Sequence, residues 1–152
     1  MALHRIAALL LSGLLFAANA FAAQVSDNDP QVSDNDLKLA LVGSWVSPPD
    51  SGSDPIPSRQ IFHDDGTTLL FIYATAECRV PAAAIEGRWT VRDGILSTQV
   101  TGTTDPRLIS IGQIQQVVIV ELEAGRVVFD ADDQLFVREK SETCYPPGSH
   151  RT

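Results

Sequence analysis

The stretch GRWTVRDGILSTQVT, residues 87–101, decides the fold class of this chain. Its first six residues alternate in polarity: Trp89 and Val91 are apolar, and the residues between and beside them, Arg88, Thr90 and Arg92, are polar or charged. Successive side chains of a β-strand point to opposite faces, so this pattern predicts a strand with Trp89 directed into a core. Asp93-Gly94 then separates this strand from another β-like run, a spacing typical of a hairpin turn in which glycine takes a positive φ.

The same arrangement continues along the chain from Leu37 onward. Short apolar runs alternate with turn residues such as Asp65-Gly66, Ala124-Gly125 and Asp132-Asp133, and no helix longer than about two turns is predicted. The predicted strands cover Leu39–Ser47, Arg59–His63, Thr68–Thr75, Ile85–Arg92, Ile95–Thr101, Gln113–Leu122, Arg126–Ala131 and Gln134–Glu139.

These strands predict an all-β fold with a single core. Hairpins in series form an antiparallel up-and-down meander, whose exposed edges are a hazard unless they are covered or the sheet closes on itself. About eight strands suit a closed barrel, and a chain of 152 residues with 44% hydrophobic content has room for one domain. We therefore assign the barrel to residues 37–144. The stretch Pro48–Pro57, rich in proline and serine, is predicted to be a loop at its rim.

Residues 1–23 are typical of a removable export signal. A short start with one arginine precedes the apolar run Ile6–Phe16, and the small residues at 18–22 offer cleavage sites. We expect cleavage near Ala22 or Ala23, and a periplasmic or secreted protein with no stable membrane insertion after cleavage. A retained anchor is the alternative, because the uncharged stretch reaches the lower limit for spanning a bilayer.

The remaining chain is acidic. Loss of residues 1–23 removes one arginine and no acid, so the net charge moves from −8 to −9, with 10 basic residues against 19 acidic ones. Nucleic acid and anionic membrane surfaces are therefore poor partners. Residues 24–36 contain the unit QVSDND twice. Two polar copies are too few for a repeat fold, so we predict a flexible acidic arm there and a disordered tail over residues 145–152.

The two cysteines, Cys78 and Cys144, predict one disulfide in an oxidising compartment. Such a bridge would close a long loop and add roughly 4 kcal/mol of stability in the chain-entropy model. Two free thiols are the alternative. A metal pair is disfavoured because no further His or Cys lies at ligand spacing.

Two short motifs point to a known group of barrels. Gly43-Ser44-Trp45 matches the Gly-x-Trp opening of the lipocalin superfamily, and Gly87-Arg88-Trp89 repeats the pattern. Over about Leu37 to Cys144 the chain resembles small lipocalin-like barrels of secreted bacterial proteins, although it is shorter than typical lipocalins and shows no clear helix after the barrel. The resemblance implies structural roles for Gly43, Trp45, Trp89 and Arg138. Arg138 would stack on Trp45, joining the first and last strands by a contact worth roughly 0.5–2 kcal/mol.

No residues in the sequence form a recognisable catalytic, nucleotide or cofactor motif, so we expect no enzyme activity and no cofactor. His63 beside Asp64 and Asp65 could bind a metal or move a proton, but polar side chains are also usual next to a turn. The cluster Asp130, Asp132 and Asp133 could hold a cation, and turn propensity accounts for it equally. We therefore predict no metal site.

Two functional hypotheses from different classes follow. The first is binding of a small apolar or amphipathic molecule inside the barrel, because both faces of Leu69–Tyr73 are apolar and the pattern is lipocalin-like. The second is binding of a secreted protein, such as inhibition of a secreted or periplasmic enzyme, through the acidic arm or the Pro48–Pro57 loop. The predicted ligand-binding residues of the first hypothesis are Leu70, Ile72, Tyr73, Trp89 and Val91.

Overall fold

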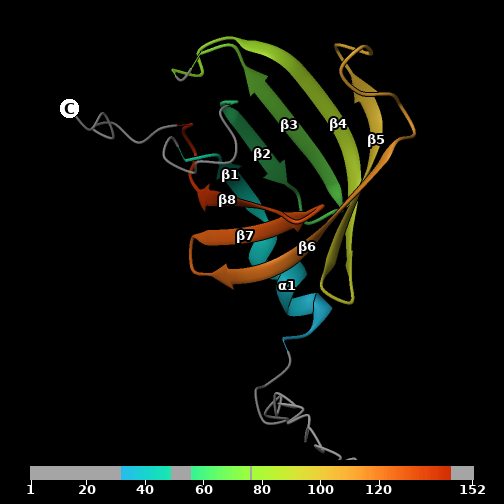
Figure 1. The fold of residues 1–152 in the computed structure, drawn as a ribbon, viewed down its shortest axis with the longest axis vertical. Helices are drawn as coiled ribbons and strands as arrows, with labels where there is room; N and C mark the ends of the chain where they lie inside the picture. Colours follow the sequence, from blue (N-terminus) through green and yellow to red (C-terminus); the bar gives the residue numbers. More distant parts are fainter. Residues whose placement is uncertain (1–31, 49–55, 76, 145–152) are drawn as a thin grey trace, which may run out of the picture. The chain divides into compact units, whose positions relative to one another are not determined.

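The computed structural model describes residues 32–48, 56–75 and 77–144. Eight antiparallel strands follow one another around a closed barrel, in which the first strand also pairs with the last (Figure 1). The predicted all-β meander is therefore confirmed. The elements are α1 (Asp34–Leu41), β1 (Gly43–Val46), β2 (Ser58–Phe62), β3 (Thr67–Tyr73), β4 (Pro81–Arg92), β5 (Ile95–Thr103), β6 (Ile114–Glu123), β7 (Arg126–Ala131) and β8 (Gln134–Lys140).

The helix α1 corrects the sequence prediction. Residues 34–36, assigned to the flexible arm, form its first turn, and residues 39–41, assigned to the first strand, form its last turn. Ser33 caps the helix by accepting a hydrogen bond from the backbone N–H of Asp36, which satisfies one of the free donors of the first turn. At the other end Leu41 is fully buried. Burial of a leucine side chain stabilises the fold by roughly 1.5–3 kcal/mol relative to leaving it exposed.

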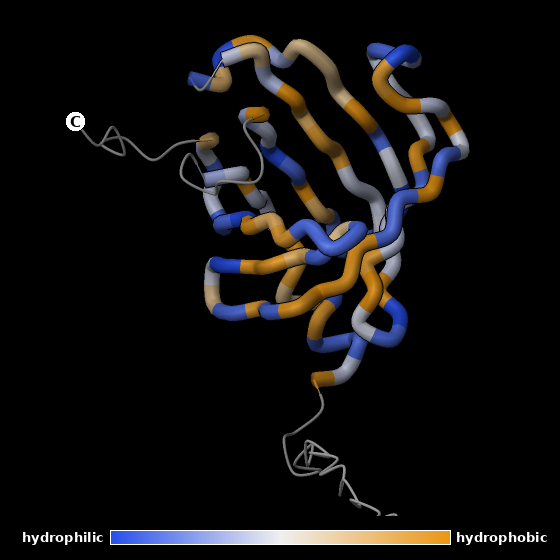
Figure 2. Tube along the Cα trace, viewed as in Figure 1, coloured by the Kyte–Doolittle hydropathy of each residue, from blue (hydrophilic) through white to orange (hydrophobic). Residues whose placement is uncertain are grey.

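The hairpin turns lie where the sequence placed them. Asp93 and Gly94 both take positive φ, at 52° and 72°, as a two-residue turn between antiparallel strands requires. Asp132 and Asp133 do the same with φ values of 53° and 64°, because aspartate tolerates this region better than most residues with a Cβ atom. The apolar residues along the strands and the hydrophilic residues at the turns are visible in Figure 2.

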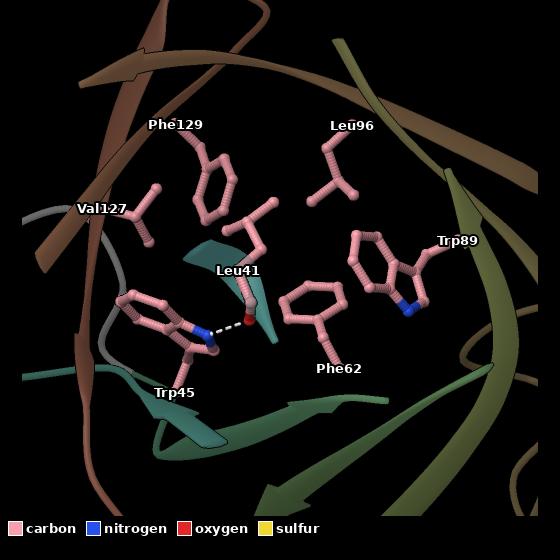
Figure 3. Packing of buried hydrophobic residues seen from close by; sticks show 7 residues of the cluster. All are labelled: Leu41, Trp45, Phe62, Trp89, Leu96, Val127 and Phe129. Carbon is pink, nitrogen blue, oxygen red and sulfur yellow. Dashed lines mark hydrogen bonds between the residues drawn. The ribbon is translucent and has the colours of Figure 1, made fainter. Parts of the chain in front are cut away.

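A packed core fills the end of the barrel next to α1 (Figure 3). The side chains that form it come from the helix and from β1, β2, β4, β5 and β7. The rings of Phe62 and Trp89 meet edge to face, with centroids 5.0 Å apart. The cluster consists of Leu41, Trp45, Phe62, Trp89, Leu96, Val127 and Phe129.

The strands are of unequal length, so the two ends of the barrel differ. Strand β5 pairs with β4 as far as Thr103, but with β6 only as far as Gln99. Strands β3, β4 and β5 consequently reach beyond β6, β7 and β8 at the end away from α1 (Figure 1). A smaller apolar cluster lies on this extension, built from Ile85, Val100 and Ile109.

The predicted disulfide is present. Cys78, in the connection after β3, is bonded to Cys144, which follows β8, and their Cα atoms are 6.0 Å apart. The bridge therefore ties the chain after the last strand to the connection between β3 and β4. Among the residues described, no helix has the length and apolar character needed to cross a membrane.

Candidate ligand-binding site

Trp45 closes the lumen at the helix end. Its indole Nε1 donates a hydrogen bond of 2.6 Å to the carbonyl of Leu41 (Figure 3). This carbonyl belongs to the last turn of α1, where no later helical N–H is available to it. The indole therefore fixes the helix against the barrel, next to the packed core.

The second Gly-x-Trp motif, Gly87-Arg88-Trp89, lies on β4. Trp89 donates from Nε1 to the carbonyl of His63 at 3.1 Å, and its backbone N–H donates to the carbonyl of Gly66 at 2.8 Å. Gly87 has to lack a side chain, because a Cβ atom there would lie 2.8 Å from the carbonyl oxygen of Gln99. Both tryptophans thus combine a buried ring with a hydrogen bond to a neighbouring loop or helix end.

A cation of the last strand lies over the Trp45 ring, and it belongs to Lys140. The Lys140 Nζ is 5.4 Å from the ring centroid, a distance at which a cation is attracted to an aromatic face. Gly43 leaves space for this side chain, since a Cβ atom there would lie 2.8 Å from the Lys140 Cε. The stacking role predicted for Arg138 stays a prediction, whereas the join between first and last strands is observed through Lys140.

Arg138 lies two residues earlier on β8 and is only 7% exposed. Its Nη1 donates to the Oγ of Ser58 at 3.2 Å, and that hydroxyl lies 3.0 Å from the Oγ of Ser47. All three residues are buried; Arg138 lies on β8, Ser58 begins β2 and Ser47 directly follows β1. A permanently charged guanidinium is therefore held inside the barrel beside two hydroxyl groups.

Between Arg138 and the packed core the lumen contains a cavity of about 110 Å³. Its lining combines apolar side chains with the guanidinium, two amides and a hydroxyl. Side chains from β2, β3, β5, β6, β7 and β8 contribute to it. The lining residues are Gln60, Leu70, Leu96, Thr98, Gln115, Val117, Phe129, Phe136 and Arg138.

The structure does not bring all five predicted ligand-binding residues together. Leu70 lines the cavity, and both Leu70 and Ile72 pack against the smaller apolar cluster. Trp89 is part of the packed core, and Val91 packs against it. Tyr73 lies beside Phe71, with ring centroids 6.3 Å apart, which places it on the opposite face of β3 from Leu70 and Ile72.

The sequence prediction missed most of the cavity wall, although a usable signal was present. Leu96 and Thr98 alternate on β5 opposite Val91 and Trp89 in the register, and Val117 and Gln115 continue the same rows on β6. If the inward-facing position of Trp89 had been followed through the strand pairing to β5 and then to β6, these residues would have been identified as inward-facing. A polar or charged residue at an inward position, such as Arg138, was the hardest to recognise, because alternation alone assigns such residues to the solvent face.

The acidic turns do not form a metal centre. In the described part of the chain, no group of three or more His, Cys, Asp or Glu is arranged to hold a metal ion. At the turn before β3, Asp65 accepts hydrogen bonds from the hydroxyl and the backbone N–H of Thr67 at 2.7 and 2.8 Å. These bonds lower the pKa of Asp65 below its usual 3.8, with the hydroxyl the largest cause. The carboxylate thereby stabilises its own turn.

Several predicted segments lie outside the described residues. They are the export signal over residues 1–23, most of the acidic arm, most of the Pro48–Pro57 loop and the tail over residues 145–152. The hypothesis of a protein partner depends on the arm or the loop, and it stays a prediction.

The chain is similar to a lipocalin-like protein from Bacteroides uniformis, with a TM-score of 0.50 and 10% identity over 67% of this chain and 99% of that one. It is also similar to an uncharacterised protein from Bacteroides eggerthii, with a TM-score of 0.46 and 13% identity over 66% and 99% of the two chains. No protein-family model and no curated protein matches it. The first similarity confirms the lipocalin-like barrel fold, and at this identity it extends to the fold alone.

Proposed function

We propose that this barrel is a binding module for a small amphipathic molecule, held in the lumen cavity between Leu70 and Arg138. The observation that carries the proposal is the cavity itself, which lies beside a tightly packed core and is lined by both apolar and polar side chains. Binding sites for small molecules combine these two features, since apolar contact supplies affinity and a few polar groups fix the orientation.

The volume of the cavity limits the size of the molecule. Pockets for drug-sized ligands measure roughly 300–1,000 Å³, whereas this cavity measures about 110 Å³. An engineered cavity of about 150 Å³ in another protein holds benzene. The occupant is accordingly a molecule of a few carbon atoms with one polar end.

The compartment proposed for this function is the periplasm or the extracellular medium. The bond between Cys78 and Cys144 supports the proposal, because structural disulfides persist where thiols are not kept reduced.

The proposal is tested by titrating the full chain with 1-butanol and, separately, with butyrate while recording methyl NMR spectra. We expect saturable shifts at the methyl groups of Leu70, Leu96 and Val117, which line the cavity. The variant Val117→Phe fills the cavity and should abolish them. Val120→Phe places the same substitution on the same strand at a residue that is 54% exposed, and it should leave them intact.

Two results would contradict the proposal. One is a lack of saturable shifts with either probe. The other is a set of shifts that survives Val117→Phe, because the probes would then bind elsewhere on the protein.

A further inference from the structure

We infer that the ligand of this cavity is a short monocarboxylate, whose carboxylate group is bound by Arg138 and whose apolar end contacts Leu70 and Val117. The inference rests on the proposed function and adds the chemical class of the ligand. It starts from a cation that lines the cavity while being 93% removed from solvent.

The charge inside the lumen is opposite to the charge of the protein. The chain as a whole carries a net charge of −8, yet among the described residues that line the cavity Arg138 alone is charged. A guanidinium keeps its positive charge at any physiological pH. The Arg138 side chain therefore attracts an anion to the cavity.

The geometry of the guanidinium favours a carboxylate over a spherical anion. Arginine presents five N–H groups in a planar fork that matches the two oxygens of a carboxylate. The hydrogen bond from Nη1 to Ser58 fixes the orientation of the fork and is compatible with a further acceptor at the same group. The side-chain amides of Gln60 and Gln115 line the same cavity. Each amide carries two N–H donors, and Gln60 directs one of them to the Thr68 hydroxyl.

The apolar side chains that line the cavity favour a carboxylate that carries an apolar chain. Leu70, Leu96 and Val117 line the cavity together with the rings of Phe129 and Phe136. An inorganic anion would leave this surface without contacts. The volume of about 110 Å³ is smaller than the roughly 150 Å³ cavity that accepts benzene, so a chain of about four carbons fits and a long-chain fatty acid does not.

The inference is tested by comparing butyrate with butyramide, which has a similar size and no charge, in titrations of the full chain. We expect butyrate to bind about tenfold or more tightly than butyramide, because charge-assisted hydrogen bonds are about twice as strong as neutral ones. In Arg138→Gln the affinities for butyrate and butyramide should be about equal. Arg107→Gln, at an exposed side chain that pairs with Asp105, should leave it unchanged.

A second variant covers the case in which Arg138→Gln does not fold. Arg138→Lys keeps the charge and loses the planar fork, so it should weaken butyrate binding while butyramide binding stays the same. Equal binding of butyrate and butyramide to the unmodified protein would overturn the inference and leave the proposed function standing. Failure of every probe, 1-butanol included, would overturn both.

Discussion

The indole Nε1 of Trp45 and the carbonyl oxygen of Leu41 are 2.6 Å apart and form a buried hydrogen bond. This bond connects the last turn of α1 to the first strand of the barrel. Because Leu41 is also fully buried in the core, the helix closes one end of the lumen. The cavity described above lies beside this core and is lined by Arg138.

Trp45→Phe removes the N–H donor together with the five-membered part of the buried indole. We expect the free energy of unfolding to fall by about 1–3 kcal/mol, because a buried carbonyl loses its partner. Urea denaturation followed by circular dichroism measures the change. Leu39→Ala, at a helix residue that is 64% exposed, is the control and should change stability by about 0.5 kcal/mol or less. An unchanged midpoint for Trp45→Phe would contradict the role assigned to this bond.

Gly87→Ala should destabilise the barrel by about 1–3 kcal/mol, because the new methyl group meets the backbone carbonyl of Gln99, which cannot move without distorting β5. Gly102→Ala is the matched control on the neighbouring strand. There the nearest atom is Oε2 of the Glu86 side chain at 3.1 Å, and a flexible side chain can move aside. Comparable losses for the two variants in urea denaturation would show that the close approach at Gly87 is not the cause.

Thr67→Val tests the turn at Asp65 through its pH dependence. The pKa of Asp65 is lowered in the folded protein, mainly by the Thr67 hydroxyl. A lowered carboxyl pKa stabilises the fold above the unfolded value of 3.8, and this contribution is lost as the pH falls through the folded pKa. The variant should therefore be less stable than the unmodified protein at neutral pH, and the difference should shrink in acid.

NMR titration of the Asp65 carboxyl measures the cause directly, and the variant should show a pKa closer to 3.8. Thr101→Val, at an exposed strand position, is the control and should leave this pKa unchanged. A Thr67→Val variant whose Asp65 titrates as in the unmodified protein would refute the assignment.

Replacing Cys78 and Cys144 together by serine should lower the free energy of unfolding by about 4 kcal/mol. The estimate follows from the entropy that the bridge removes from the unfolded chain, given a sequence separation of 66 between the two cysteines. Thermal unfolding with and without reducing agent measures the same quantity in the unmodified protein. A midpoint that does not respond to reduction would contradict a stabilising role.

Much of the barrel could be predicted from the sequence, because strand alternation and hairpin turns are local signals. Residues 126–131 form the predicted strand to the residue, and Asp93-Gly94 forms the predicted turn. The helix was missed because its apolar residues also fit a strand. The Ser33 cap with Asp36 three residues later was the signal that distinguished the two.

The candidate site was far less predictable than the fold. Its wall combines side chains from six strands that lie far apart in the sequence, and their meeting depends on the closure of the barrel. Tyr73 was predicted to bind the ligand because both faces of Leu69–Tyr73 are apolar, yet successive residues of a strand face opposite sides. Whether an inward position is filled or borders a cavity depends on packing volumes, which no local pattern records.

Intermolecular NOE spectroscopy of the full chain with butyrate tests whether a short carboxylate binds inside the lumen beside Arg138. We expect NOEs from the butyrate methyl group to the methyl groups of Leu70 and Val117, and no NOEs to Val120, which is 54% exposed. NOEs to Val120 in the absence of any to Leu70 and Val117 would contradict binding in the lumen.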